Sequence, residues 1–176
     1  MPRVKTFKLK DNKLYNEEQK ELLLESLKQY FLNYKCHLEE ILDIVENNET
    51  LIKLAMIDFF VTIYAKKHKC FIELPGYEYF YINDEYKNQL KSFTKTLFDP
   101  FKRNKKMEFS YDDITFTTTV GQLNFLKWAL KHGIIKYMKE HYESINIGHK
   151  KHLENKKIKQ EEKNKLKQLA KLETAV

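Results

Sequence analysis

The sequence has little glycine, proline and cysteine, and these shortages exclude several kinds of site. Four glycines among 176 residues leave little material for a phosphate-cradling loop, and no P-loop, dinucleotide or GxSxG spacing occurs. Cys36 and Cys70 lie 34 positions apart without a CxxC spacing, and no apolar N-terminal segment suggests a secretory signal. We therefore expect synthesis in a reducing, intracellular compartment, and no cofactor.

The sequence also lacks a long apolar run. The longest one is far too short to cross a bilayer, so we expect a soluble protein without a membrane span. A chain of 176 residues is long enough to bury a sizeable core in one domain.

Positive charge is present in excess and is unevenly placed. Residues 149–176 hold nine lysines and four glutamates, which is +5 of the formal +7, and residues 1–13 contribute a further +4. A third basic cluster consists of Lys102, Arg103, Lys105 and Lys106. Such placement fits phosphate backbones, anionic membranes or acidic protein surfaces, and it fits equally well a lysine-rich solvated surface in an organism with an AT-biased genome.

Helical spacing of apolar residues dominates the first third of the chain. Asn16 has the features of a helix cap, and an apolar stripe then continues to Val45 with a break near Asn33. Residues 51–63 leave so few polar positions that we expect a central helix there, with Asp58 at its edge or paired with a basic side chain.

Two segments have the pattern of β-hairpins. Residues 70–74 and 79–83 are rich in aromatic and branched side chains and flank Pro75 and Gly76. Residues 107–111 and 114–118 flank a turn at Asp112 and Asp113, which we interpret as turn formers and not as a catalytic pair.

Three further helices are predicted in the second half. One is capped by Asn83 or Asp84 and ends before Asp99 and Pro100. The next starts at a capping box of Thr119 and Gln122, ends near Gly133 and carries Trp128 in the core. The last covers residues 134–145.

These patterns together predict an α+β fold, a mostly helical single domain with two short β-hairpins. We expect a basic N-terminal arm over residues 1–15, a globular domain over 16–148, and a lysine-rich tail over 149–176 that is helical or disordered.

No metal site is expected, although histidines and cysteines occur in two suggestive groups. His149 and His152 are three apart but lack further ligands, so we interpret them as solvated residues. A zinc site would need the set Cys36, His37, His68 and Cys70, whose spacing matches no standard pattern, and we interpret both cysteines as core residues.

Three segments resemble a family of small uncharacterised proteins from large nucleocytoplasmic DNA viruses of the mimivirus and phycodnavirus kind. They are DFFVTIYAKK (58–67), YKNQLKSFTKTLFDPFKR (86–103) and TTTVGQLNFLKWAL (117–130), and the resemblance covers roughly residues 51–145. It implies a motif surface that includes Asp99, Gln122 and Asn124. Ile63 stands where we expect asparagine, which weakens any catalytic cluster beside Asp58.

Two functions of different class remain open. The first is a non-enzymatic viral protein that binds nucleic acid without sequence specificity, through Lys102, Arg103, Lys105, Lys106 and the terminal lysines. The second is a structural or assembly protein of the virion that makes protein–protein contacts. Either role places the protein in the host cytoplasm or viral factory, or packaged in the virion, and neither fixes an oligomeric state.

Overall fold

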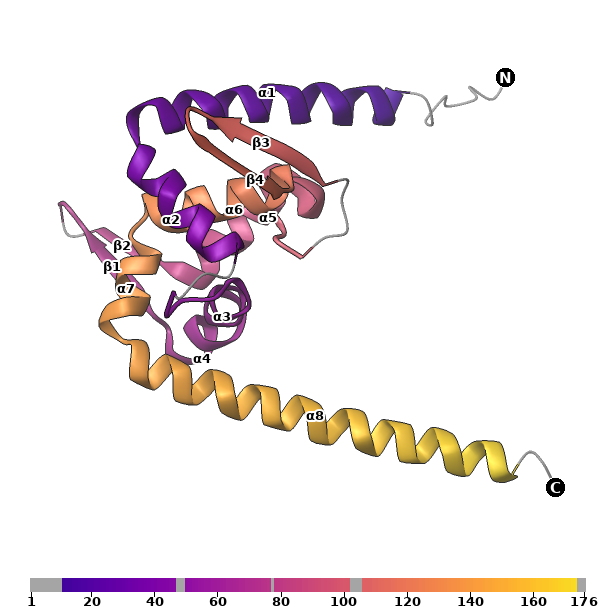
Figure 1. Ribbon diagram of the computed structural model, residues 1–176. Coiled ribbons are helices and arrows are strands. Elements are labelled where there is room, and N and C mark those ends of the chain that lie inside the picture. Colours follow the sequence, from indigo (N-terminus) through magenta and orange to yellow (C-terminus); the bar gives the residue numbers. More distant parts are fainter. Residues whose placement is uncertain (1–10, 47–49, 77, 102–105, 174–176) are drawn as a thin grey trace, which may run out of the picture.

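The apolar stripe at the start of the chain forms two helices, α1 (Asp11–Asn33) and α2 (Lys35–Val45) (Figure 1). The structure is a computed structural model, which describes residues 11–46, 50–76, 78–101 and 106–173. Tyr34 separates the two helices, so the predicted break is confirmed. The predicted cap at Asn16 is wrong, because α1 already begins at Asp11. Leu27 and Phe31 of α1 are fully buried, which fixes the side of this helix that faces the core.

A continuous helical rod lies at the centre of the molecule, as the apolar composition predicts. It consists of α3 (Leu54–Phe59), the π-helix η1 (Phe60–Tyr64) and α4 (Ala65–His68). Phe60 and Val61 are fully buried. π turns are rare, occur mostly as single-turn bulges inside α-helices, and are frequent at functional sites. In this rod Thr62 donates from Oγ1 to the carbonyl of Asp58 at 2.6 Å, inside the transition between the two helix types.

Both predicted hairpins are confirmed. Strands β1 (Phe71–Leu74) and β2 (Glu78–Tyr81) pair antiparallel, as do β3 (Met107–Tyr111) and β4 (Ile114–Thr118). An isolated two-stranded sheet is only marginally stable in water, so each hairpin needs an anchor. Phe109 and Phe116 anchor the second hairpin, and Phe80 anchors the first by stacking on His132 at 4.8 Å.

Two helices cross close together in the body, α5 (Ile82–Phe98) and α6 (Val120–Lys131). α5 ends before Asp99 and Pro100 as predicted, but its cap is Tyr81 and not Asn83 or Asp84. Thr94 interrupts α5 with φ 63° and ψ 163°, a region that almost only glycine adopts. α6 starts as predicted, because Thr119 Oγ1 accepts a hydrogen bond from the amide of Gln122 at 3.1 Å. The glutamine half of the predicted capping box is wrong, because the Gln122 side chain accepts from Thr118 Oγ1 at 2.8 Å and so is tied to the end of β4.

The last two helices differ from the prediction of one helix over 134–145. Gly133, with φ 72°, separates α6 from α7 (Ile134–Glu140), and α8 (Tyr142–Glu173) then runs past the body as one long helix (Figure 1). Its first turns dock on the central rod, because Ile145 is fully buried. Phe59 lies 5.1 Å from the His149 ring and 5.2 Å from the His152 ring. These two histidines are therefore half-buried, and their assignment as solvated tail residues is wrong.

Buried positions otherwise follow the predicted core. Trp128 is buried, as is Cys70, whereas Cys36 is exposed, which corrects its assignment to the core. No helix in the described part of the chain is both long enough and apolar enough to cross a membrane.

Candidate functional site

The basic loop predicted to contact phosphates lies mostly outside the described residues. Lys102, Arg103 and Lys105 belong to the segment 102–105, of which the structure describes nothing. Lys106 is exposed directly before β3. Its position is compatible with the predicted phosphate contact, which stays a prediction.

Of the residues of the predicted motif surface, Asn124 links α6 to α5. Asn124 is 3% exposed and donates from Nδ2 to the carbonyl of Leu97 at 3.0 Å. Asp99 is half-buried and accepts from the amide of Phe101 at 2.9 Å, which closes the turn after α5. Asn124 therefore has a packing role, while Asp99 and Gln122 keep partly exposed side chains.

A half-buried carboxylate lies beside this junction. Burial raises the pKa of Asp58, the nearby charge of Asp99 raises it further, and Lys156 of α8 acts in the opposite direction. Burial, followed by the charges of Asp58 and Asp99, also raises the pKa of Tyr86 to about 12. The side chains of Asp58, Tyr86 and Asp99, far apart in the sequence, thus form one electrostatic cluster.

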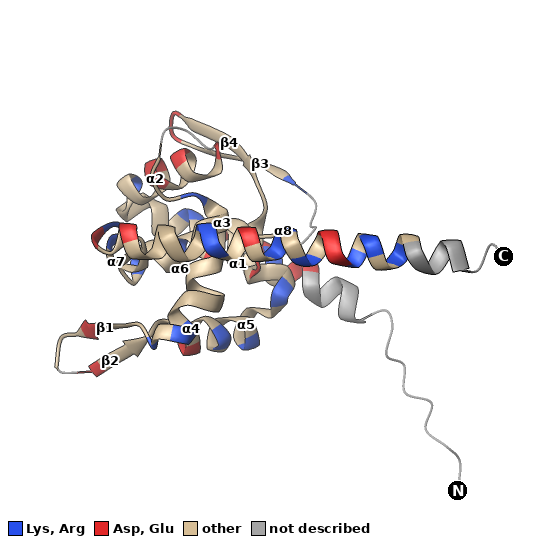
Figure 2. Cartoon of the chain, turned by 90° about the horizontal axis from the view of Figure 1, so that it is seen from below, with Lys and Arg blue, Asp and Glu red and all other residues tan. Residues whose placement is uncertain are grey.

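One face of α8 is rich in lysine and is bordered by Glu162, three residues after Lys159. His152, Lys156, Lys159 and Lys163 line a shallow hollow together with Asn155 and Gln160, and Lys167 follows four residues later. Residues three, four or seven apart share a helix face, which places Glu154 and Glu161 with Lys150, Lys157 and Lys165 on another face. We call Lys156, Lys159, Lys163 and Lys167 the lysine face. Figure 2 shows basic and acidic segments along the projecting part of α8.

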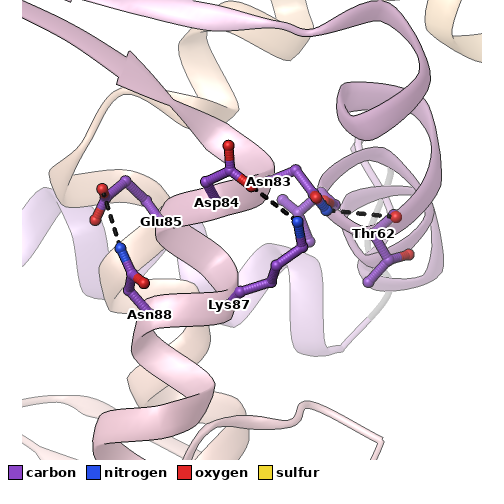
Figure 3. A network of polar contacts seen from close by, with 7 residues as sticks. Thr62, Asn83, Asp84, Glu85, Lys87 and Asn88 are labelled. Carbon is purple, nitrogen blue, oxygen red and sulfur yellow. Dashed lines mark hydrogen bonds and ion pairs between the residues drawn. The ribbon is translucent and has the colours of Figure 1, made fainter.

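A second basic region lies where the β1–β2 hairpin joins the body. Lys66, Lys69 and Lys87 border an open cavity of 410 Å³, which we call the lysine hollow and whose other lining residues are Ala65, Cys70, Tyr81, Asn83 and Asp84. Lys87 pairs with Asp84 at 2.8 Å, so the three lysines are only partly neutralised (Figure 3). Burial raises the pKa of the Cys70 thiol, which keeps it protonated and argues against a nucleophile.

Asn83 fixes the floor of the lysine hollow. Its Nδ2 donates to the carbonyl of Val61 at 2.7 Å, with a longer contact to the carbonyl of Thr62 at 3.5 Å (Figure 3). Both carbonyls belong to the π-helix, so this side chain links η1 to the first turn of α5. The hollow is therefore a preformed feature of the body.

The residues considered for zinc are not brought together by the described contacts. The ring of His37 meets the hydroxyl of Tyr30 at 2.6 Å, and His68 stacks on Tyr64 at 4.2 Å. Within the described ranges, no three His, Cys, Asp or Glu side chains are grouped closely enough to hold a metal ion.

The terminal lysines were predicted to contact phosphates, but neither the grouping of four of them on one face of α8 nor the lysine hollow was predicted. The spacings of three, four and four residues from Lys156 to Lys167 indicate in the sequence itself that these lysines share one side of a helix. The hollow had no such signal, because its lysines come from α4, its C-cap and α5, which only the tertiary structure brings together.

Comparison with known proteins gives two matches. The profile of a family of unknown function, DUF7197, matches residues 3–175. Uncharacterized protein L507 of Acanthamoeba polyphaga mimivirus is 35% identical over 132 residues, which is 70% of this chain and 51% of that protein. The chain therefore spans about half the length of this relative. No solved structure matches significantly.

Proposed function

We propose a binding function for this chain, which belongs to the family of unknown function DUF7197 and is related to an uncharacterised giant-virus protein. It binds nucleic acid without sequence specificity and acts in the host cytoplasm or viral factory, or packaged in the virion. The lysine face of α8 makes the main phosphate contacts. The basic loop with Lys102, Arg103, Lys105 and Lys106 adds to them.

The segregation of charge on α8 is the observation that supports this proposal. Lys156 has a carboxylate neighbour in the body, Asp58, but along the rest of the face like charges three or four residues apart repel each other. A phosphate backbone removes that repulsion. Lys167 lies eleven residues after Lys156, or about 16 Å along the helix, a length over which duplex DNA carries roughly ten phosphate charges.

Salt dependence tests the proposal, because phosphate contacts release counterions. Log affinity for duplex DNA should fall linearly with log salt, and four phosphates neutralised by the lysine face contribute about 3.6 to that slope. In the variant K156Q/K159Q/K163Q the slope should fall by about 2.7, and binding to unrelated sequences should weaken by similar factors. Fluorescence anisotropy with labelled duplexes at several salt concentrations measures both quantities.

A matched control comes from the same helix. The variant K150Q/K157Q/K165Q loses the same net charge from the mixed face of α8, and it should keep a slope close to that of the unchanged protein. Equal effects of the two triple variants would mean that net charge alone matters and would overturn the role of the lysine face. Undetectable binding of the intact chain to DNA and RNA at low salt would discard nucleic-acid binding.

Exposed apolar side chains on α8 favour a second candidate, an assembly protein of the virion. Ile147 is 67% exposed and Ile158 is 48% exposed, and eleven residues bring them to the same side of the helix. A protein partner that covers them would bind through apolar burial, which depends little on salt. Loss of a salt-insensitive association in the variant I147S/I158S, measured by sedimentation, would support this candidate.

A further inference from the structure

The β1–β2 hairpin exposes three aromatic side chains on one face. Phe71 of β1 lies opposite Tyr81 of β2, and Tyr79 is two residues before Tyr81 in the same strand. Because side chains alternate along a strand, all three lie on the same side of the hairpin. Phe71 is 40% exposed, Tyr81 46% and Tyr79 53%. The Phe71 ring lies 5.0 Å from the Tyr79 ring and 5.9 Å from the Tyr81 ring, which makes one continuous aromatic platform.

The platform is held in place by the opposite face of the hairpin. Phe80 is buried there, stacks on His132 and lies 6.3 Å from the ring of Trp128. The exposed rings are therefore not needed to attach the hairpin to the body. Contiguous exposed apolar groups rimmed by polar residues are typical of interaction sites.

Positive charge borders the platform. Tyr81 lines the lysine hollow with Lys66, Lys69 and Lys87, and Phe71 lines a neighbouring hollow that also includes Lys69. Lysine segments on α4 and α5 continue from the base of the hairpin (Figure 2). The combination of stacking rings with adjacent cations matches one class of ligand, because each nucleotide of a single strand offers a base face beside a phosphate.

We infer that this region binds single-stranded nucleic acid, with bases stacked on Phe71, Tyr79 and Tyr81 and a phosphate in the lysine hollow. The inference rests on the proposed function and deepens it, because the lysine face of α8 contacts backbone phosphates of either form. Bases of a duplex are already stacked on each other, so the platform adds affinity only for single strands. Glu73, directly opposite Tyr79 in the register, repels phosphates, so a base stacked on Tyr79 has its phosphate on the side of the lysine hollow.

Anisotropy with oligothymidylate and with a duplex of equal length tests the inference on the intact chain. The variant F71L/Y79L/Y81L keeps apolar side chains but loses the rings. Its affinity for the single strand should fall by about fivefold or more for each stacked base, with duplex binding unchanged. The matched control is Y34L, which removes a similarly exposed tyrosine from between α1 and α2 and should change neither affinity.

A second variant keeps the test independent of folding defects in the triple variant. Y79W places a larger ring on the platform, and oligothymidylate should quench its fluorescence while binding at least as tightly. Absence of quenching, or equal losses for single strand and duplex in the triple variant, overturns this inference alone. Failure of both nucleic acids to bind overturns the proposed function as well. A change in sedimentation of the triple variant without loss of oligothymidylate binding assigns the platform to a protein contact and also overturns it.

Discussion

Gly121 is the position where one added methyl group should have the clearest effect on the fold. A Cβ there would lie 2.9 Å from the carbonyl oxygen of Thr96 and 3.3 Å from both the amide nitrogen of Phe98 and the carbonyl oxygen of Asp99. All three are backbone atoms of the end of α5 and the following turn, so no side-chain rotation relieves the contact. The variant G121A should therefore push α5 and α6 apart at the junction that Asn124 also bridges.

The magnitude follows from two opposing effects. Overpacking of a buried site costs about 1–3 kcal/mol, whereas alanine is favoured over glycine inside a helix by about 1 kcal/mol. We expect G121A to lower the free energy of unfolding by up to about 2 kcal/mol. Gly148, in α8, supplies the control, because the atoms nearest to a Cβ there are ring carbons of the half-buried Tyr64 at 3.1 Å and of Phe59 at 3.7 Å. The Tyr64 ring can move, so G148A should be neutral or more stable by up to about 1 kcal/mol.

Chemical and thermal unfolding of both variants measure the difference. Each kcal/mol should shift Tm by about 2–4 °C in a chain of this size. Gly121 lies in the first turn of α6 and Gly148 inside α8, so the propensity gain is smaller for G121A, and a gap of more than about 1 kcal/mol reports the contact. Equal stability of G121A and G148A would refute the close approach of α6 to the end of α5.

Three further outcomes are expected. T119A should lose about 1 kcal/mol in urea unfolding, because it removes the acceptor for a first-turn amide of α6. Unchanged stability with lost oligonucleotide binding would instead make this threonine a binding residue. Asp58, whose pKa is raised by burial and then by a nearby carboxylate, holds its proton more tightly in the folded state. Stability should therefore fall as pH rises through that pKa, and D58N should be the more stable protein at pH 7, by a margin that closes toward about pH 4. A constant margin from unfolding at several pH values would show that burial of this carboxyl group does not raise its pKa. A chain ending at Asn155 should keep the cooperative melt, whereas one ending at Gly148 should melt lower, because it lacks both histidines that contact Phe59. Identical melts would show that this contact adds no stability.

Local patterns predicted the elements well because the forces behind them act over a few residues. The break near Asn33, the two hairpins and the stop before Pro100 all follow from side-chain spacing or from proline geometry. The capping function of Thr119 follows in the same way from its position before the first turn. The family resemblance expected from three short segments is confirmed over nearly the whole chain.

Misassignments came where a distant segment decides the outcome. Asn83 is a residue type that favours helix caps, but its side chain donates a hydrogen bond to the carbonyl of Val61 in the π-helix instead. His149 and His152 lie in a charged segment, and only the position of Phe59 reveals that they dock α8. The lysine hollow could not be predicted for the same reason, since its sides come from α4 and α5.

The docking of α8 has a consequence for how this helix forms. An isolated helix is limited by its first turn, whose ordering is costly, while each further residue adds little cost. The buried turn around Ile145 supplies that nucleus, so the helix propagates outward from the body along its charged part. The rate of amide hydrogen exchange should therefore increase gradually from His149 toward Lys167, without an abrupt step. A ligand on the lysine face would slow exchange at the far end most, where the unbound helix frays.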